Sequence, residues 1–191
     1  MQRFIHITNS FKKEFHFTHP GMYTVFVHNI SGTFQFSIES PGIDLMIFGL
    51  FTLKQNDTYK LETIQRHGAP SSTSNLLIKS IVADSAKFSY RGLIRIEKNA
   101  QKSHAYQKNQ NLLISSDGFV DSRPYLEILA NDVFCTHGST TGTLDTQQLH
   151  YVQSRGLSPS EAEHLLLFGF AEEVIQRVKE RVPQFTFRPS I

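Results

Sequence analysis

The sequence contains a single cysteine, Cys135, among its 191 residues. One cysteine cannot form a disulfide within the chain, and it excludes a zinc or iron–sulfur site built from several cysteines of this chain alone. The lack of cysteine pairs agrees with a reducing compartment. We therefore predict a cytoplasmic protein without structural disulfides.

The sequence also has no long apolar run and no basic block. Its longest apolar stretch, residues 45–53, contains Gly49 and Thr52 and is far too short to span a bilayer. Residues 1–17 alternate apolar and charged side chains and lack the apolar core of a signal peptide. Lys and Arg are spread along the chain, and the net charge is only +2. We therefore predict neither a membrane nor a nucleic acid as the partner.

Apolar residues are plentiful, and they recur with a period of two. Hydrophobic residues make up 39% of the chain and 16 residues are Phe, which is enough to bury a core. From Tyr23 to about Ala130 apolar and polar residues alternate, which is typical of half-buried β-strands. Strands recur about every 16 residues, with turn signals between them and no helix. This recurrence favours either a β-sandwich or a solenoid of stacked strands, and periodicity alone leaves both open.

Two helices are predicted after the strands. Asp145 caps the first helix, and Gly156 supplies its left-handed stop. The second helix opens with a Ser-Pro-Ser-Glu capping box at residues 158–161 and ends at Pro183. We expect the helices to pack against the end of the β region and the tail, residues 184–191, to be frayed. The side chains expected to make that packing contact are Leu149, Val152, Leu165 and Leu166.

Several segments, in order, resemble the SufB/SufD family of iron–sulfur cluster assembly proteins. Residues 124–138 resemble a signature in which a proline and a Leu-Glu-Ile strand lead into Ala-Asp-Asp-Val and then Cys-Ser-His-Gly. The resemblance covers roughly residues 41–178, and five segments in the right order make it specific. The further matching positions are His67, Ala69, Pro70, Ser74, Lys79, residues 105–107 and 111–115, Thr140, Gly142, Leu144, Asp145, Tyr151 and residues 154–156.

The resemblance implies a mainly β fold, a right-handed parallel β-helix followed by a short helical domain. It thereby favours the solenoid over the sandwich. We expect a β-helix core over residues 1–142 and a C-terminal helical region over residues 143–191. Relatives are usually much longer, and whether the chain is a naturally short member or a piece of a longer product stays open at this point.

The resemblance also implies a role and partners. In the family, SufB and SufD pair through their β-helices, and each holds one copy of the ATPase SufC on its helical domain. The chain is then a non-catalytic scaffold for SufB-like and SufC-like proteins, or a partner of a second copy of itself. No cofactor is expected to bind stably, although iron or a nascent cluster is shared with SufB transiently. The residues matching the SufC-docking region are Leu149, Tyr151, Arg155 and Gly156.

His137 and Cys135 are the candidate iron or nascent-cluster ligands. His137 matches the histidine of Cys-Ser-His-Gly, which the family places at the SufB–SufD interface. An imidazole nitrogen and a thiolate are donors that suit iron, and on an extended strand residues two apart point to the same face. The alternative for Cys135 is a small buried hydrophobic residue, which is the commonest role of a free cysteine.

Two departures favour the SufD branch of the family over SufB. SufB carries a central cysteine at a position that aligns near Asn109, where this chain has none, and Gly138 stands where SufB has a glutamate. Two other function classes are compatible with a β-helix. One is a stand-alone β-helical interaction module without a cluster role. The other is an enzyme such as a polysaccharide-active β-helix, which the scattered carboxylates disfavour.

Overall fold

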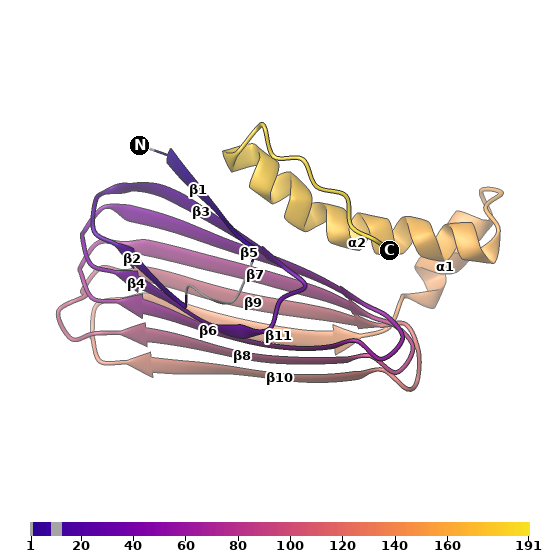
Figure 1. Ribbon diagram of the computed structural model, residues 1–191, viewed down its shortest axis with the longest axis horizontal. Helices are drawn as coiled ribbons and strands as arrows, with labels where there is room; N and C mark the ends of the chain where they lie inside the picture. The colour runs from indigo at the N-terminus through magenta and orange to yellow at the C-terminus, as the bar shows by residue number, and fades with distance from the viewer. Residues whose placement is uncertain (1, 9–12) are drawn as a thin grey trace.

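The computed structural model of the protein describes residues 2–8 and 13–191. Residues 1 and 9–12, which fall within the predicted β-helix range of 1–142, lie outside the described residues. Strands precede two helices (Figure 1). The strands are β1 (Gln2–Ile7), β2 (Glu14–Phe17), β3 (Gly21–His28), β4 (Gly32–Ile38), β5 (Ile43–Leu53), β6 (Thr58–His67), β7 (Thr73–Val82), β8 (Lys87–Ile96), β9 (His104–Leu113), β10 (Phe119–Ile128) and β11 (Phe134–Gly142), and the helices are α1 (Thr146–Gln153) and α2 (Pro159–Arg181).

Successive strands alternate between two parallel sheets. One sheet, called sheet A, has the order β1-β3-β5-β7-β9-β11, and the other, sheet B, has the order β10-β8-β6-β4-β2. Every neighbouring pair in both sheets is parallel. The chain therefore winds as a flattened solenoid (Figure 1). The predicted β-helix is confirmed, and the sandwich is wrong.

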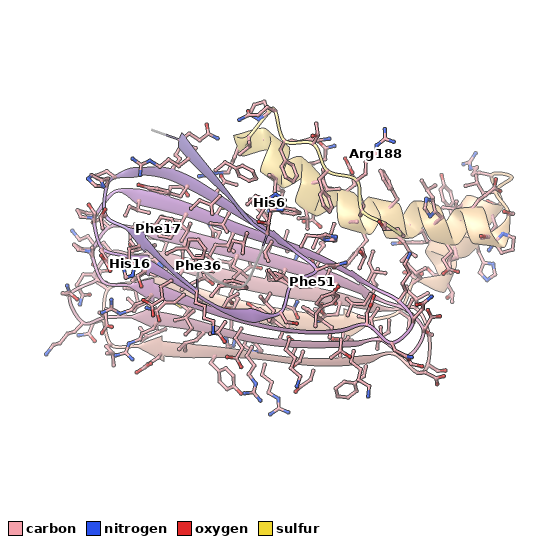
Figure 2. The ribbon with its side chains drawn as sticks, in the orientation of Figure 1. His6, His16, Phe17, Phe36, Phe51 and Arg188 are labelled. Carbon is pink, nitrogen blue, oxygen red and sulfur yellow. The ribbon has the colours of Figure 1, made fainter. Side chains whose placement is uncertain are left out.

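The alternating apolar residues fill the space between the sheets. Figure 2 shows Phe17, Phe36 and Phe51 lying there, and all three are buried. Stacking in register places like positions of successive turns above one another, as Phe15 of β2 and Phe36 of β4, whose rings stack at 5.5 Å. The alternation of residue types thus forms a continuous apolar core through the early turns.

The interior of the later turns also contains buried polar residues. His67 is fully buried, its Nδ1 2.9 Å from Ser72 Oγ and its Nε2 2.7 Å from Ser74 Oγ. Gln107 and Asn109 of β9 also face inward and are fully buried. Buried polar groups are tolerated where they find hydrogen-bond partners.

Helix α2 lies along the outer face of sheet A (Figure 1), where it contacts β3, β5 and β7. The expectation that the helices cover the end of the β region is therefore wrong. The reason is that a second apolar surface, on the outer side of sheet A, offers α2 a matching face. Leu165, expected in the contact, is exposed, and α1 buries no residue. The cluster comprises Phe26, Phe48, Leu50, Leu77, Ile81, Leu167, Ala171, Val174, Ile175, Val178, Val182 and Phe185.

Ion pairs and hydrogen bonds also hold α2 against the outer face of sheet A. Lys79 of β7 is 3% exposed, donates to the Phe170 carbonyl and to the Glu173 carboxylate, and lies 4.1 Å from the centre of the Phe170 ring. Arg181 donates to Asp44 Oδ2 of β5 at 2.8 Å. A charged side chain that is buried between α2 and sheet A needs such a partner, because an unpaired buried charge would destabilise the fold.

Helix capping agrees with the sequence, whereas the tail does not. Asp145 accepts hydrogen bonds from the Gln147 and Gln148 amides, and Ser158 and Glu161 form the capping box. The tail beyond α2 is not frayed, because Phe185 is buried against Phe26 of β3 with ring centres 4.9 Å apart. None of the helices in the described part of the chain is long and apolar enough to cross a membrane.

Candidate functional site at the open end of the solenoid

The last turn of the solenoid ends in two edge strands. Strands β10 and β11, called the open end below, each pair with one neighbour only within the described chain. An unpaired edge presents backbone donors and acceptors to another chain. Large apolar side chains are exposed on or beside these two strands: Phe119, Tyr125, Leu126, Ile128, Leu129 and Phe134.

Some of the exposed apolar residues face the interior of the solenoid. Leu126 and Ile128 pair with Ile94 and Ile96 of β8, which are completely buried in the core. Leu126 and Ile128 are nevertheless 37% and 40% exposed, because no further turn covers them. The open end thus presents a cross-section of the solenoid's interior.

Strand β11 carries both predicted ligands on its inward face. Cys135 pairs with Ala105 and His137 with Gln107, and both partners are buried. Cys135 is half-buried against an apolar cluster that includes Ile96 and Ala130, whereas His137 is exposed. The two side chains lie on one face, as an extended strand requires.

The Cys135 thiol is held in its protonated form. Burial raises its pKa to about 11, so that at neutral pH very little thiolate is present. In the isolated chain Cys135 therefore behaves as a small apolar residue. Binding to a metal would require displacement of the proton by the metal ion itself. Both interpretations of Cys135 stay predictions.

A hydrogen-bonded network centred on Asn109 lies beside the candidate ligands Cys135 and His137. Asn109 Oδ1 accepts from Ser122 Oγ and from Asn111 Nδ2, each at 2.7 Å. Ser139 Oγ of β11 donates to Ser122 Oγ of β10 at 2.8 Å. Asn109 Nδ2 donates to the carbonyl of Ile78 at 3.2 Å. These bonds connect β7, β9, β10 and β11 and hold the two edge strands in place.

In the sequence, Asn109 stood out only as the position where SufB carries a cysteine. The hydrogen-bonded network around it was not predicted. The available signal was the inward-facing run Gln107, Asn109 and Asn111, in which polar residues occupy every position that the period of two assigns to the core. Three consecutive polar residues on the buried face of a strand indicate a network, because each needs a partner.

The described chain does not contain a ready-made metal site. Within residues 2–8 and 13–191, no three His, Cys, Asp or Glu side chains lie in an arrangement that could hold a metal ion. His67 is unsuited to binding a metal for a further reason, since it is fully buried and both of its ring nitrogens are engaged by serine hydroxyls. Any cluster at the open end would need ligands from another chain or molecule.

The predicted docking residues lie apart from the two ligands, on α1 and just after it. Tyr151 is 61% exposed, and the Arg155 guanidinium lies 5.2 Å from the centre of its ring. Leu149 is half-buried, and Gly156 has a φ of +98°, which favours glycine at the turn between the helices. Leu165 and Phe168 on α2 are exposed as well.

Comparison with known proteins decides the family. Residues 27–170 match the family model described as "SUF system FeS cluster assembly, SufBD core domain". The chain belongs to the SufBD family. Its similarity to the iron–sulfur cluster assembly protein SufD of Escherichia coli (strain K12) is 33% identity over 126 residues, which is 66% of this chain and 30% of that protein. The resemblance seen in the sequence is therefore confirmed.

Two further relatives extend the comparison. SufD of Bacillus subtilis (strain 168) is 31% identical over 125 residues, covering 65% of this chain and 28% of that protein. The chloroplastic protein ABCI7 of Arabidopsis thaliana is 35% identical over 113 residues, covering 59% of this chain and 24% of that protein. The matched part of the chain thus spans less than a third of the length of each of these relatives.

Proposed function

We propose that this chain acts as a SufD-type, non-catalytic scaffold subunit in iron–sulfur cluster assembly. The observation that carries the proposal is the position of the family-matched Cys-x-His-Gly segment. It lies on β11, an edge strand of the solenoid, with His137 exposed on the inward face of the open end. A residue on a free edge can be shared between two chains, whereas one in a central strand cannot.

The open end has the properties of a surface that is covered in an assembly. Two edge strands, one in each sheet, each leave one edge unpaired within the described chain, which allows a partner to extend both sheets by main-chain hydrogen bonds. Six large apolar side chains nearby would then leave water, and such burial drives association. A SufB-like protein is the proposed partner, and a second copy of this chain is the alternative occupant of the same surface.

The nascent cluster is proposed as cargo rather than as a resident cofactor. His137 can offer an imidazole nitrogen and Cys135 a thiolate once its proton is displaced. Two donors are too few for a cluster, which normally takes four protein ligands. The SufB-like partner would therefore supply the remaining ligands across the open end.

A SufC-like ATPase is the proposed partner of the helical region. Helix α1 buries no residue against the rest of the described chain, and Tyr151 on α1 and Phe168 on α2 are exposed. An exposed apolar surface of this kind indicates an interaction site. We further propose that the protein works in the cytoplasm, since a lone protonated thiol suits a reducing compartment.

Anaerobic co-expression with SufB-like and SufC-like proteins tests the proposal. The expected result is a complex containing all three chains, in which His137→Ala lowers the iron and sulfide content without dissociating the complex. The matched control is His164→Ala, an exposed histidine on α2, which should leave the cluster content unchanged.

Two outcomes would contradict the proposal at different levels. Failure to bind either partner would remove the scaffold role and favour a stand-alone interaction module. An intact complex whose cluster content is the same in the His137→Ala variant would exclude His137 as a ligand while retaining the scaffold role.

A further inference from the structure

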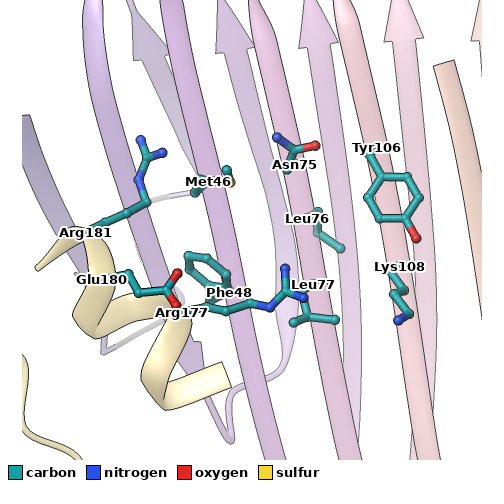
Figure 3. A pocket seen from close by; sticks show the side chains of 10 residues that line it. All are labelled: Met46, Phe48, Asn75, Leu76, Leu77, Tyr106, Lys108, Arg177, Glu180 and Arg181. Atoms are coloured by element: carbon teal, nitrogen blue, oxygen red, sulfur yellow. The ribbon is translucent and has the colours of Figure 1, made fainter. Parts of the chain in front are cut away.

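A groove of about 360 Å³ lies on the outer face of sheet A, beside the C-terminal half of α2 (Figure 3). It is separate from the open-end site. Its residues on β9, Tyr106 and Lys108, project outward, whereas Gln107 and Asn109 project into the solenoid. The volume is within the usual range for small-molecule sites, roughly 300–1,000 Å³.

The floor and one wall of the groove are apolar or aromatic. Phe48 and Leu77 are almost fully buried and form the floor with Met46. The Tyr106 ring stands on β9 at the far side and is 41% exposed (Figure 3). An exposed aromatic ring beside an apolar floor suits a flat apolar body, which gains both burial and ring contact.

The rim of the groove carries more positive than negative charge. Lys79 and Arg177 both pair with Glu173, the Arg177 Nη2 to Glu173 Oε1 distance being 3.0 Å. Lys108 is close enough to act on both members of the Lys79–Glu173 pair. Burial lowers the pKa of Lys79, its pairing with Glu173 opposes this shift, and Lys108 and Arg177 add smaller repulsions. Three cations therefore lie close to one carboxylate, that of Glu173.

A count of the neighbouring charges supports this conclusion. Three cations, Lys79, Lys108 and Arg177, face two carboxylates, Glu173 and the groove residue Glu180, which leaves one positive charge in excess. The remaining groove cation, Arg181, is already neutralised by Asp44 at 2.8 Å. Figure 3 shows Arg177 reaching from α2 across the floor toward β7, with Lys108 on β9 beyond it.

We propose that this groove binds a small planar organic anion. Its flat body would lie on Phe48 and Leu77 against Tyr106, and its acidic group would lie between Lys108 and Arg177. A simple inorganic anion would leave the apolar floor unused, and a neutral apolar molecule would leave the excess charge unused. The ligand would contact both α2 and β9, so its binding stabilises the docked position of α2.

The fluorescent anion 8-anilinonaphthalene-1-sulfonate is a suitable probe, because it combines a flat apolar body with one sulfonate. Titration of the full chain should show one saturable site. Lys108→Gln and Arg177→Gln should each raise the dissociation constant of the probe by about tenfold, which is the effect of losing one charge-assisted contact. The matched control is Lys98→Gln, an exposed lysine after β8, which should bind like the wild type. Circular dichroism checks that all variants fold.

Competition and a second variant separate the outcomes. 1-Naphthalenesulfonate should displace the probe, and neither naphthalene nor inorganic sulfate should do so at the same concentration. Because the probe also favours exposed apolar surfaces, Leu126→Ser at the open end serves as a further control and should leave its affinity unchanged. Binding that is lost in Leu126→Ser but kept in Lys108→Gln would overturn the proposal, as would displacement by sulfate alone or the absence of saturable binding. None of these readouts depends on the cluster-assembly role.

Discussion

The two ends of the solenoid expose equivalent sheet edges but protect them differently. At the N-terminal end, β2 has only four residues, and its outward side chains Glu14 and His16 are polar, whereas Phe15 and Phe17 are buried. At the open end, β10 and β11 have ten and nine residues and expose large apolar side chains. Short, charged edge strands discourage strand addition, and long apolar ones favour it. The difference supports the proposed association at the open end.

The number of residues in one turn of the solenoid also differs between the N-terminal end and the later turns. Gln2 of β1 pairs with Met22 of β3, 20 residues later, whereas Thr73 of β7 pairs with His104 of β9, 31 residues later. The first turn is therefore about two thirds as long as a later one. Phe17 is buried against Tyr23 of β3, with ring centres 4.8 Å apart, whereas Leu126 lies on an edge strand and is 37% exposed.

The largest expected effect comes from truncating one Phe at each end. Phe17→Ala should lower the free energy of unfolding by about 3–5 kcal/mol, because it opens a cavity in a packed interior. Phe134→Ala, at a side chain that is 72% exposed, should lower it by less than about 0.5 kcal/mol. Urea denaturation of both variants measures the difference. Equal losses would contradict the contrast between the ends.

The next effect concerns His67 and pH. Burial lowers its pKa from 6.5 to about 4 in the folded protein, so the neutral form is favoured on folding. The resulting stabilisation, about 3 kcal/mol, is fully present above pH 6.5 and is lost as the pH falls toward 4. Relative to His67→Gln, the wild type should lose this amount of unfolding free energy between pH 7 and 4. A constant difference between the two proteins would contradict the assignment.

His16 at the N-terminal end should respond in the opposite direction. Its hydrogen bond to Glu39, with the charges of Glu39 and Glu14, raises its pKa above the ordinary value. The protonated form is therefore favoured on folding, and this contribution is present below pH 6.5 and lost as the pH rises through the raised pKa. His16→Gln should remove a small stabilisation at pH 5.5 and none at pH 9, measured by thermal unfolding.

An effect smaller than that of Phe17→Ala should come from Asn109→Ala in the polar network. The change removes the Asn109 acceptor of the Ser122 hydroxyl and one of the acceptors of the Asn111 side-chain amide, which costs about 2 kcal/mol. Hydrogen exchange should accelerate in β10 and β11 while the amides of β3 and β5 keep their protection. Asn131→Ala, at an exposed position before β11, is the control. Uniform acceleration in all strands would show that Asn109 stabilises the whole solenoid rather than the open end.

The smallest effect on stability is expected at Cys135, where reactivity is the measurement. With a pKa of about 11, its thiol should react with iodoacetamide at pH 7.5 about 100-fold more slowly than an ordinary cysteine. Full unfolding in urea should restore the ordinary rate. A fast reaction in the folded chain would mean that Cys135 is not protonated by burial, and would strengthen its case as a metal ligand.

Local features were readable from the sequence because their causes are local. The caps Asp145 and Ser158 act within three residues of their own backbone, and alternation along β4 depends only on the period of a strand. Family resemblance added the solenoid and the candidates His137 and Cys135. The pairing of both on one face of β11 followed from its extended conformation.

Other features were decided only when distant segments met. The sequence by itself determined strands, helix starts, the turn at Gly156 and family membership, all of which depend on short-range chemistry or on matched motifs. Tertiary structure decided that α2 covers the face of sheet A, that Phe185 packs on Phe26, and that Asn109 connects four strands. Those outcomes depend on which apolar surfaces and polar groups remain unpaired once the solenoid has wound, and that is a property of the assembled coils rather than of any one segment.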